Sequence, residues 1–208
     1  MFEIIKAGGW VMVPILLCSI VAFAIILERF WSLQRKKIIP PNLVADIWQG
    51  FKDETFDENS LRRLKKGSAL GQVLAAGLVN MQHEREIMKE AVEDCGRHVV
   101  HELERFLNTL GTIASITPLL GLLGTVIGMI KVFNTITTAG VGDASLLAGG
   151  ISEALITTAA GLTVAIPALM FYRYFRGLTD DYVVRMEEEA LKLVEVIHGE
   201  RERDDLDR

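Results

Sequence analysis

The chain has 208 residues, of which 50% are hydrophobic and 24% are charged, and its formal net charge at pH 7 is −5. Charged side chains are nearly absent from residues 10–27, 107–130 and 144–172 and are dense in residues 28–105 and 173–208. One globular core does not usually separate its residues in this way. The pattern argues against a single soluble domain and predicts an all-α membrane protein with three transmembrane helices. We expect no nucleic-acid partner.

Each apolar stretch is long enough to cross a bilayer, which takes about 20 helical residues. In chain order the sequence predicts a short periplasmic N-terminus (1–9), the first span (10–31) and a cytoplasmic helical domain (32–106). The second span (107–132), a periplasmic loop (133–145) and the third span (146–174) follow. A cytoplasmic C-terminal helix with its tail (175–208) ends the chain.

The distribution of basic residues predicts the orientation of these spans. Lys and Arg follow span one, precede span two and follow span three, whereas the segment between spans two and three has none beyond Lys131 at its edge. Because cytoplasmic loops carry the excess of basic residues, the N-terminus is expected outside and the C-terminus in the cytoplasm. The basic run Arg35-Lys36-Lys37 is interpreted as an anchor to anionic lipid.

The polar segments have the spacing of amphipathic helices. Apolar residues recur at intervals of three and four from Ile87 to Leu110, so we expect one helix that runs without a break into span two. The same spacing continues after span three as far as Ile197. The sequence therefore predicts that spans two and three both extend as long helices into the cytoplasm, and that the Pro40-Pro41 pair interrupts the chain after span one.

Glu153 is the one formally charged side chain in residues 144–172. A carboxylate near the middle of a span costs at least a few kcal/mol by insertion scales, about 2.5–3.5 kcal/mol for Asp. Two interpretations remain open. The carboxyl either holds helices together by hydrogen bonds, or it alternates between protonated and ionised forms and takes part in moving charge.

Small and hydroxylic residues line the second and third predicted spans at helical spacing. Thr117, Gly121 and Thr125 share one face of span two, and Glu153 and Thr157 share a face of span three. Gly residues at this spacing let helices approach closely, so the two spans are expected to face each other or a common cavity. A threonine in a membrane helix often bonds only to its own backbone, and that alternative stays open for each of these residues.

Other chemistry is not indicated. Cys95, His98 and His101 follow one another at intervals of three, but the first and last point about 120° apart on a helix and cannot converge on one ion. No nucleotide-binding or hydrolase motif is present in the sequence. We therefore expect no enzymatic activity, no metal site and no cofactor.

Two blocks of sequence, 118-PLLGLLGTVIG-128 and 150-GISEALITTAAGLTVAIP-167, resemble the ExbB/TolQ/MotA family of proton-channel subunits, and most closely its ExbB (biopolymer transport protein) members. The resemblance implies a ring-forming homo-oligomer, typically a pentamer, in the bacterial inner membrane. It implies that the ring encloses a dimer of a single-span ExbD-like partner and that proton flow energises a TonB-like protein for outer-membrane transport. By the same resemblance Glu153, Thr158 and Thr125 belong to the proton pathway, with Thr157 and Thr117 as possible pore-lining residues.

Three alternatives to an ExbB role remain from the sequence. The first is a TolQ-like subunit of the Tol-Pal envelope system, which has the same motifs. The second is a passive membrane scaffold in which Glu153 only joins helices. A secondary transporter is the weakest, since it would normally need more spans and an internal repeat.

Overall fold

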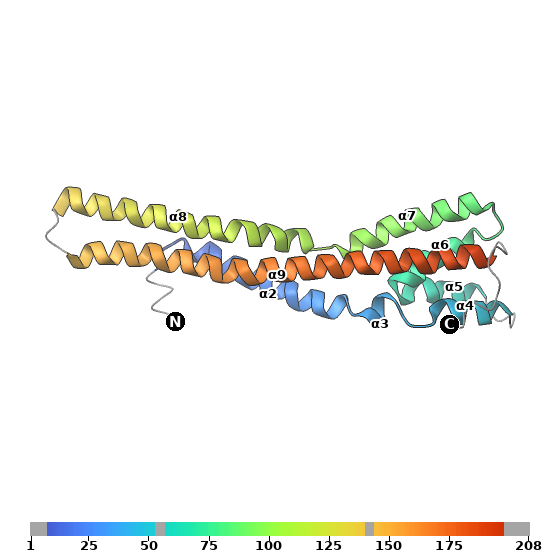
Figure 1. Ribbon diagram of the computed structural model, residues 1–208. Coiled ribbons are helices and arrows are strands. Elements are labelled where there is room, and N and C mark those ends of the chain that lie inside the picture. Colours follow the sequence, from blue (N-terminus) through green and yellow to red (C-terminus); the bar gives the residue numbers. More distant parts are fainter. Residues whose placement is uncertain (1–7, 53–56, 140–143, 198–208) are drawn as a thin grey trace. The chain divides into compact units, whose positions relative to one another are not determined.

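The computed structural model describes residues 8–52, 57–139 and 144–197, and every regular element in these ranges is an α-helix (Figure 1). The all-α prediction is confirmed for this part of the chain. By its contacts the chain divides into two compact units. Unit 1 comprises residues 1–29 and 106–174, and unit 2 comprises residues 30–105 and 175–208.

Unit 1 is built from three apolar helices. They are most of α2 (Met12–Ser32), α8 (Leu107–Ala139) and the first part of α9 (Ala144–Ile197). Each is long and apolar enough to cross a membrane, and no more than 33% of the most apolar window of any of them is buried within the chain. Their exposed apolar surface is suited to lipid or to other protein chains.

Helices α8 and α9 are antiparallel and pack through small residues. A Cβ atom on Gly121 would lie 3.1 Å from the Cα of Thr158, and one on Gly128 would lie 2.8 Å from the Cβ of Ala154. A Cβ on Gly161 would lie 3.2 Å from the Cα of Gly121. The predicted small-residue faces of spans two and three therefore contact each other, and the two backbones approach so closely that larger side chains would not fit.

The prediction of one unbroken helix leading into span two is wrong. Helix α7 (Arg85–Leu103) ends before Glu104, and α8 begins at Leu107. Phe106, between them, has a φ angle of 63°, in the left-handed region that bulky residues rarely adopt. Of the two predicted extensions, only that of span three is a continuous helix in this structure.

Unit 2 is centred on α6 (Ala69–Val79), which is apolar on nearly every side and buries most of its residues. It is preceded by α3 (Arg35–Ile38), α4 (Leu43–Lys52) and α5 (Glu58–Gly67), so the chain is interrupted at Pro40-Pro41 as predicted. The Asp57 carboxylate caps α5 by accepting from the backbone N–H of Ser60 at 2.8 Å. This hydrogen bond holds the pKa of Asp57 below its usual value.

Helix α7 packs on α6 where a glycine allows it. A Cβ on Gly77 would lie 3.1 Å from Cγ2 of Val92 and 3.2 Å from Cε of Met88. The Cys95 thiol lies nearby and donates to the carbonyl of Gln72 at 3.5 Å. Burial raises the pKa of Cys95, which keeps the thiol protonated and a poor nucleophile near neutral pH.

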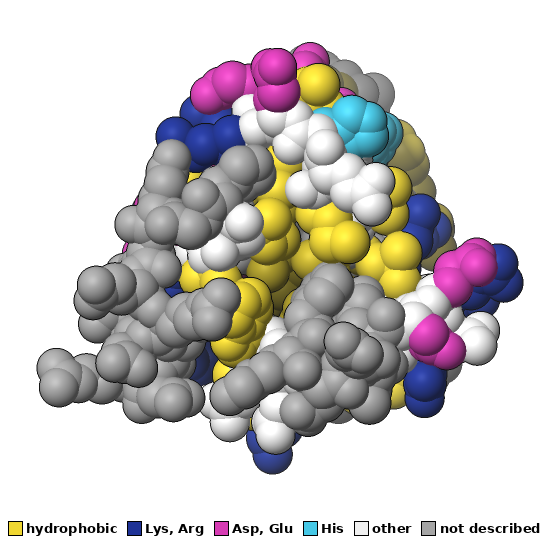
Figure 2. Space-filling model, turned by 90° about the vertical axis from the view of Figure 1, so that its right-hand side faces the viewer, with side chains coloured by type: hydrophobic (Ala, Val, Ile, Leu, Met, Phe, Trp, Pro, Cys, Tyr) yellow, Lys and Arg dark blue, Asp and Glu magenta, His cyan; other side chains and the backbone are white. Residues whose placement is uncertain are grey.

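The second part of α9 completes unit 2. Met186, Ala190 and Val194 are buried, which confirms the amphipathic spacing predicted after span three. The Tyr182 hydroxyl donates to the carbonyl of Leu33 at 3.0 Å, and so ties α9 to the residue that follows α2. Figure 2 shows acidic and basic side chains around the margin of one face of the molecule, with hydrophobic side chains nearer the middle.

Candidate functional site

Glu153 in α9 forms an ion pair with Lys131 in α8. Its Oε1 lies 2.6 Å from the Lys131 Nζ, across the antiparallel pair of helices. The Glu153 side chain is 20% exposed and that of Lys131 is 51% exposed. The carboxylate is therefore largely withdrawn from the surface but has a compensating positive charge, which reduces the cost of placing it in an apolar helix.

The backbone before α2 lies against the same carboxylate. Gly9 has a φ angle of +66°, and a Cβ atom placed on it would overlap Oε1 of Glu153. Only glycine combines this backbone conformation with so close an approach. Glu153 is thus held between Lys131 on one element and Gly9 on another.

Thr158 and Thr125 use their hydroxyls differently. Thr158 Oγ1 donates to the carbonyl of Gly121 at 3.0 Å and so connects α9 to α8. Thr125 Oγ1 donates to the carbonyl of Leu122, three residues earlier in its own helix, at 2.6 Å. For Thr125 the structure therefore shows the local backbone bond that the sequence left open.

Thr117 and Thr157 lie inside the contact between the two helices. They are 0% and 1% exposed. Thr117 donates to the carbonyl of Ile113, and Thr157 to that of Ala154 at 2.9 Å. A Cβ on Gly124 would overlap the Thr157 side chain. Both threonines therefore contribute to the packing of α8 against α9.

The strength of the contact between Glu153 and Lys131 depends on the charge of the carboxyl group. An ionised Glu153 is attracted by the Lys131 ammonium, whereas a protonated carboxyl is neutral and keeps only a hydrogen bond. Protonation of Glu153 therefore weakens its attachment to α8, and ionisation restores it.

Two residues of this site, Lys131 and Gly9, are not among the functional residues predicted from the sequence. Lys131 stands there only as a charge at the edge of a loop, and Gly9 only as part of a short N-terminus. Lys131 becomes a neighbour of Glu153 because α8 and α9 are antiparallel and Gly128 packs against Gly150 and Ala154. The register of the Gly and Ala residues that brings the pair together is set by the packing of α8 against α9, so the sequence alone did not identify it.

Comparison with known proteins agrees with this architecture. A model of the MotA/TolQ/ExbB proton channel family matches residues 65–188, more than half of the chain. An ExbB-like biopolymer transport protein of Synechocystis sp. is 37% identical over 82% of the chain and 68% of its own length. The biopolymer transport protein exbB1 of Vibrio cholerae is 28% identical over 75% of the chain and 70% of its own length.

A relative named for the Tol-Pal system is similar to the chain at a comparable identity. The Tol-Pal system protein TolQ of Haemophilus influenzae is 29% identical over 78% of the chain and 76% of its own length. Together with three helices able to span a bilayer, these matches show that the chain is a multi-pass membrane protein and belongs to the MotA/TolQ/ExbB proton channel family.

Proposed function

We propose that this chain is a proton-conducting motor subunit of the bacterial inner membrane, with its N-terminus periplasmic and its C-terminus cytoplasmic. It forms a ring, expected to be a pentamer, around a dimer of a single-span ExbD-like partner. Proton flow at this contact drives a TonB-like protein for outer-membrane transport. The apolar surface that α2, α8 and α9 leave exposed supports such an assembly.

The observation that carries the proposal is the ion pair of Glu153. A carboxylate in an apolar helix with a lysine at 2.6 Å is held in place, but protonation can release it. Thr158 and Thr125 lie on the same two helices and are proposed to belong to the pathway. A proton that crosses a potential of 100 mV releases about 2.3 kcal/mol, so several protons are needed for each mechanical step.

The central test replaces Glu153 by Gln, which keeps the shape of the side chain but cannot titrate. We expect Glu153→Gln to abolish proton-driven function in the native host while the purified variant still forms the wild-type oligomer. Function is measured as energised uptake, and assembly by size-exclusion chromatography with light scattering. Glu187→Gln, an exposed position on α9, is the matched control and should change neither.

Two results would contradict the motor role. Full energised uptake by Glu153→Gln would show that no proton passes through this carboxyl. Loss of the oligomer together with function would instead favour the passive scaffold, because the carboxyl would then be needed to hold helices together.

A TolQ-like role in the Tol-Pal system is the second candidate, favoured by the TolQ relative from Haemophilus influenzae. Deletion of the gene distinguishes the two. An ExbB role predicts loss of TonB-dependent uptake with an intact outer membrane, whereas a TolQ role predicts leakage of periplasmic protein and detergent sensitivity with uptake preserved.

A further inference from the structure

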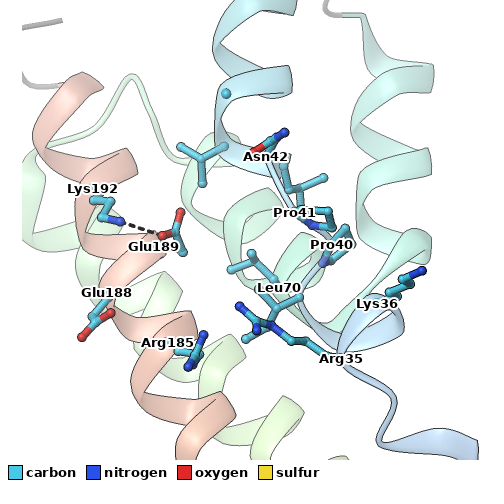
Figure 3. Close-up of a pocket in the computed structure, with 14 residues that line it drawn as sticks. Arg35, Lys36, Pro40, Pro41, Asn42, Leu70, Arg185, Glu188, Glu189 and Lys192 are labelled. Carbon is cyan, nitrogen blue, oxygen red and sulfur yellow. Dashed lines mark hydrogen bonds and ion pairs between the residues drawn. The ribbon is translucent and has the colours of Figure 1, made fainter. Parts of the chain in front are cut away.

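Unit 2 contains a cavity of about 550 Å³ between α3, the turn that follows it, α6 and α9 (Figure 3). Its floor is apolar and includes Leu70, which is 1% exposed. Pro40 and Pro41 form one wall. The cavity is thus a shaped hollow in one unit, remote in sequence from Glu153.

The charged residues of this cavity are predominantly basic. Arg35 and Lys36 come from α3, and Arg185 and Lys192 come from α9. In Figure 3 the guanidinium group of Arg35 extends toward α9, on the side where Arg185 lies. Two positive groups that face each other across a hollow repel unless an anion lies between them.

The acidic residues at the cavity do not neutralise these two arginines. Glu189 is paired with Lys192 at 2.7 Å, and Glu188 also lines the cavity but forms no ion pair with either arginine in the described part of the chain. Within the described residues no ion pair involves Arg35, Lys36 or Arg185. Lys37, next in the chain, is turned elsewhere, with its Nζ 3.3 Å from the centre of the Trp31 ring.

From this geometry we propose that the cavity is a binding site for a phosphate-bearing anion, with Arg35 and Arg185 as its principal ligands. Guanidinium groups bind phosphate oxygens in pairs and hold them better than ammonium groups do. The apolar floor accepts the carbon atoms next to the phosphate. The proposal is independent of the role of Glu153.

The position of the cavity favours a lipid headgroup as the source of this phosphate. Arg35 is three residues beyond the end of α2 at Ser32. Three residues reach at most about 11 Å, and the headgroup layer on one side of a bilayer is about 5–8 Å thick, so Arg35 is within reach of that layer. A free phosphate compound has the same chemistry, and the experiment separates the two.

The experiment measures thermal unfolding of the full chain in a non-ionic detergent and a phosphate-free buffer. Short-chain phosphatidylglycerol, short-chain phosphatidylcholine and inorganic phosphate are titrated separately, and the dependence of the unfolding temperature on concentration yields an apparent Kd. The site variant is Arg35→Gln/Arg185→Gln. The control variant Arg63→Gln/Lys66→Gln removes the same charge from exposed positions of α5, away from the cavity.

For the wild type and the control variant we expect phosphatidylglycerol to raise the unfolding temperature more than phosphatidylcholine does. For the site variant we expect roughly thirtyfold weaker binding, because each basic residue near a membrane surface contributes about 1 kcal/mol and hence about fivefold. Stabilisation by inorganic phosphate that is lost in the site variant supports the site with a free phosphate as its source.

Three outcomes would overturn the proposal. They are equal stabilisation by both lipids, equal weakening of binding in the site and control variants, and no stabilisation by phosphatidylglycerol or by inorganic phosphate. Circular dichroism of the site variant in the absence of ligand checks its fold, and Gln keeps the helical propensity of these positions close to that of Arg.

Discussion

Glu153 and Lys131 together set the charge of the apolar region of unit 1. Neither residue alone explains the site, because a lone carboxylate or ammonium in this setting would be costly to keep ionised. At 2.6 Å the pair is a charge-assisted hydrogen bond, and both side chains are partly exposed. Each side chain of the pair therefore compensates the charge of the other.

A double-mutant cycle tests this pairing. Lys131→Met leaves the carboxylate without its partner, and Glu153→Gln leaves the ammonium without one, so each should lower the free energy of unfolding at pH 7. The double variant should be more stable than the sum of the two losses predicts, by about 1 kcal/mol, since Lys131 is half exposed and solvent weakens the attraction. Urea unfolding in detergent measures the coupling, and additive losses would contradict it.

We expect substitution of Gly9 to impair both stability and function, because the Gly9 backbone lies against the Glu153 carboxylate. Gly9→Ala forces a side chain into the left-handed region, at about 1–2 kcal/mol, and its Cβ displaces Glu153. We expect a lower unfolding temperature and loss of proton-driven function. Gly149→Ala is the control, because a Cβ there has no neighbour within 4 Å. Equal behaviour of the two variants would show that Gly9 does not position Glu153.

Among the helices, the break between α7 and α8 is a feature that the local sequence does not predict. Residues 104–106 contain no Gly or Pro, and the apolar spacing continues through them. Nevertheless α7 ends with a hydrogen bond from the backbone N–H of Glu104 to the carbonyl of Val100. Helix α8 begins with one from the N–H of Leu110 to the carbonyl of Phe106. Phe106 also lies under the Arg29 guanidinium, 5.8 Å from its ring centre, so a contact distant in sequence accompanies the unusual backbone.

The relative stability of the Phe106→Gly and Phe106→Ala variants distinguishes a break at this position from a continuous helix. With a φ of 63° at this position, Phe106→Gly should be more stable than Phe106→Ala, by about 1 kcal/mol. In an unbroken helix the order would be reversed by a similar amount, because Gly is about 1 kcal/mol less favourable than Ala there. Thermal unfolding of the two variants measures the order, and both lack the ring, so its loss cancels.

The orientation of the whole molecule in the membrane rests on its basic residues. The proposed topology places the C-terminal end of α8 outside and α4 in the cytoplasm. In a variant with Cys18→Ala and Cys95→Ala, a membrane-impermeant maleimide added to cells with a permeabilised outer membrane should label Thr138→Cys and not Gln49→Cys. Both positions are exposed in the structure, so accessibility within the chain does not decide the result. The opposite pattern of labelling would invert the topology.

Several features follow from sequence because they depend on a long run of residues. Three runs of apolar residues produce three membrane-length helices, since only a helix satisfies its backbone hydrogen bonds in lipid. The close packing of α8 on α9 follows from Gly121 and Gly128 at small-residue spacing. Glu153 stands out by its charge alone, and these features need no knowledge of any distant contact.

Other features depend on which residues the fold brings together, and sequence could not supply them. Lys131 and Glu153 are 22 residues apart and meet only because α9 packs against α8 in a particular antiparallel register. The burial of Thr117 and Thr157 depends on the same register. The break at Phe106 and the convergence of Arg35 with Arg185 likewise depend on contacts between segments far apart in the chain. Hydropathy and spacing determine which segments become helices, whereas partners across helices are selected by packing, and packing is decided by the tertiary structure.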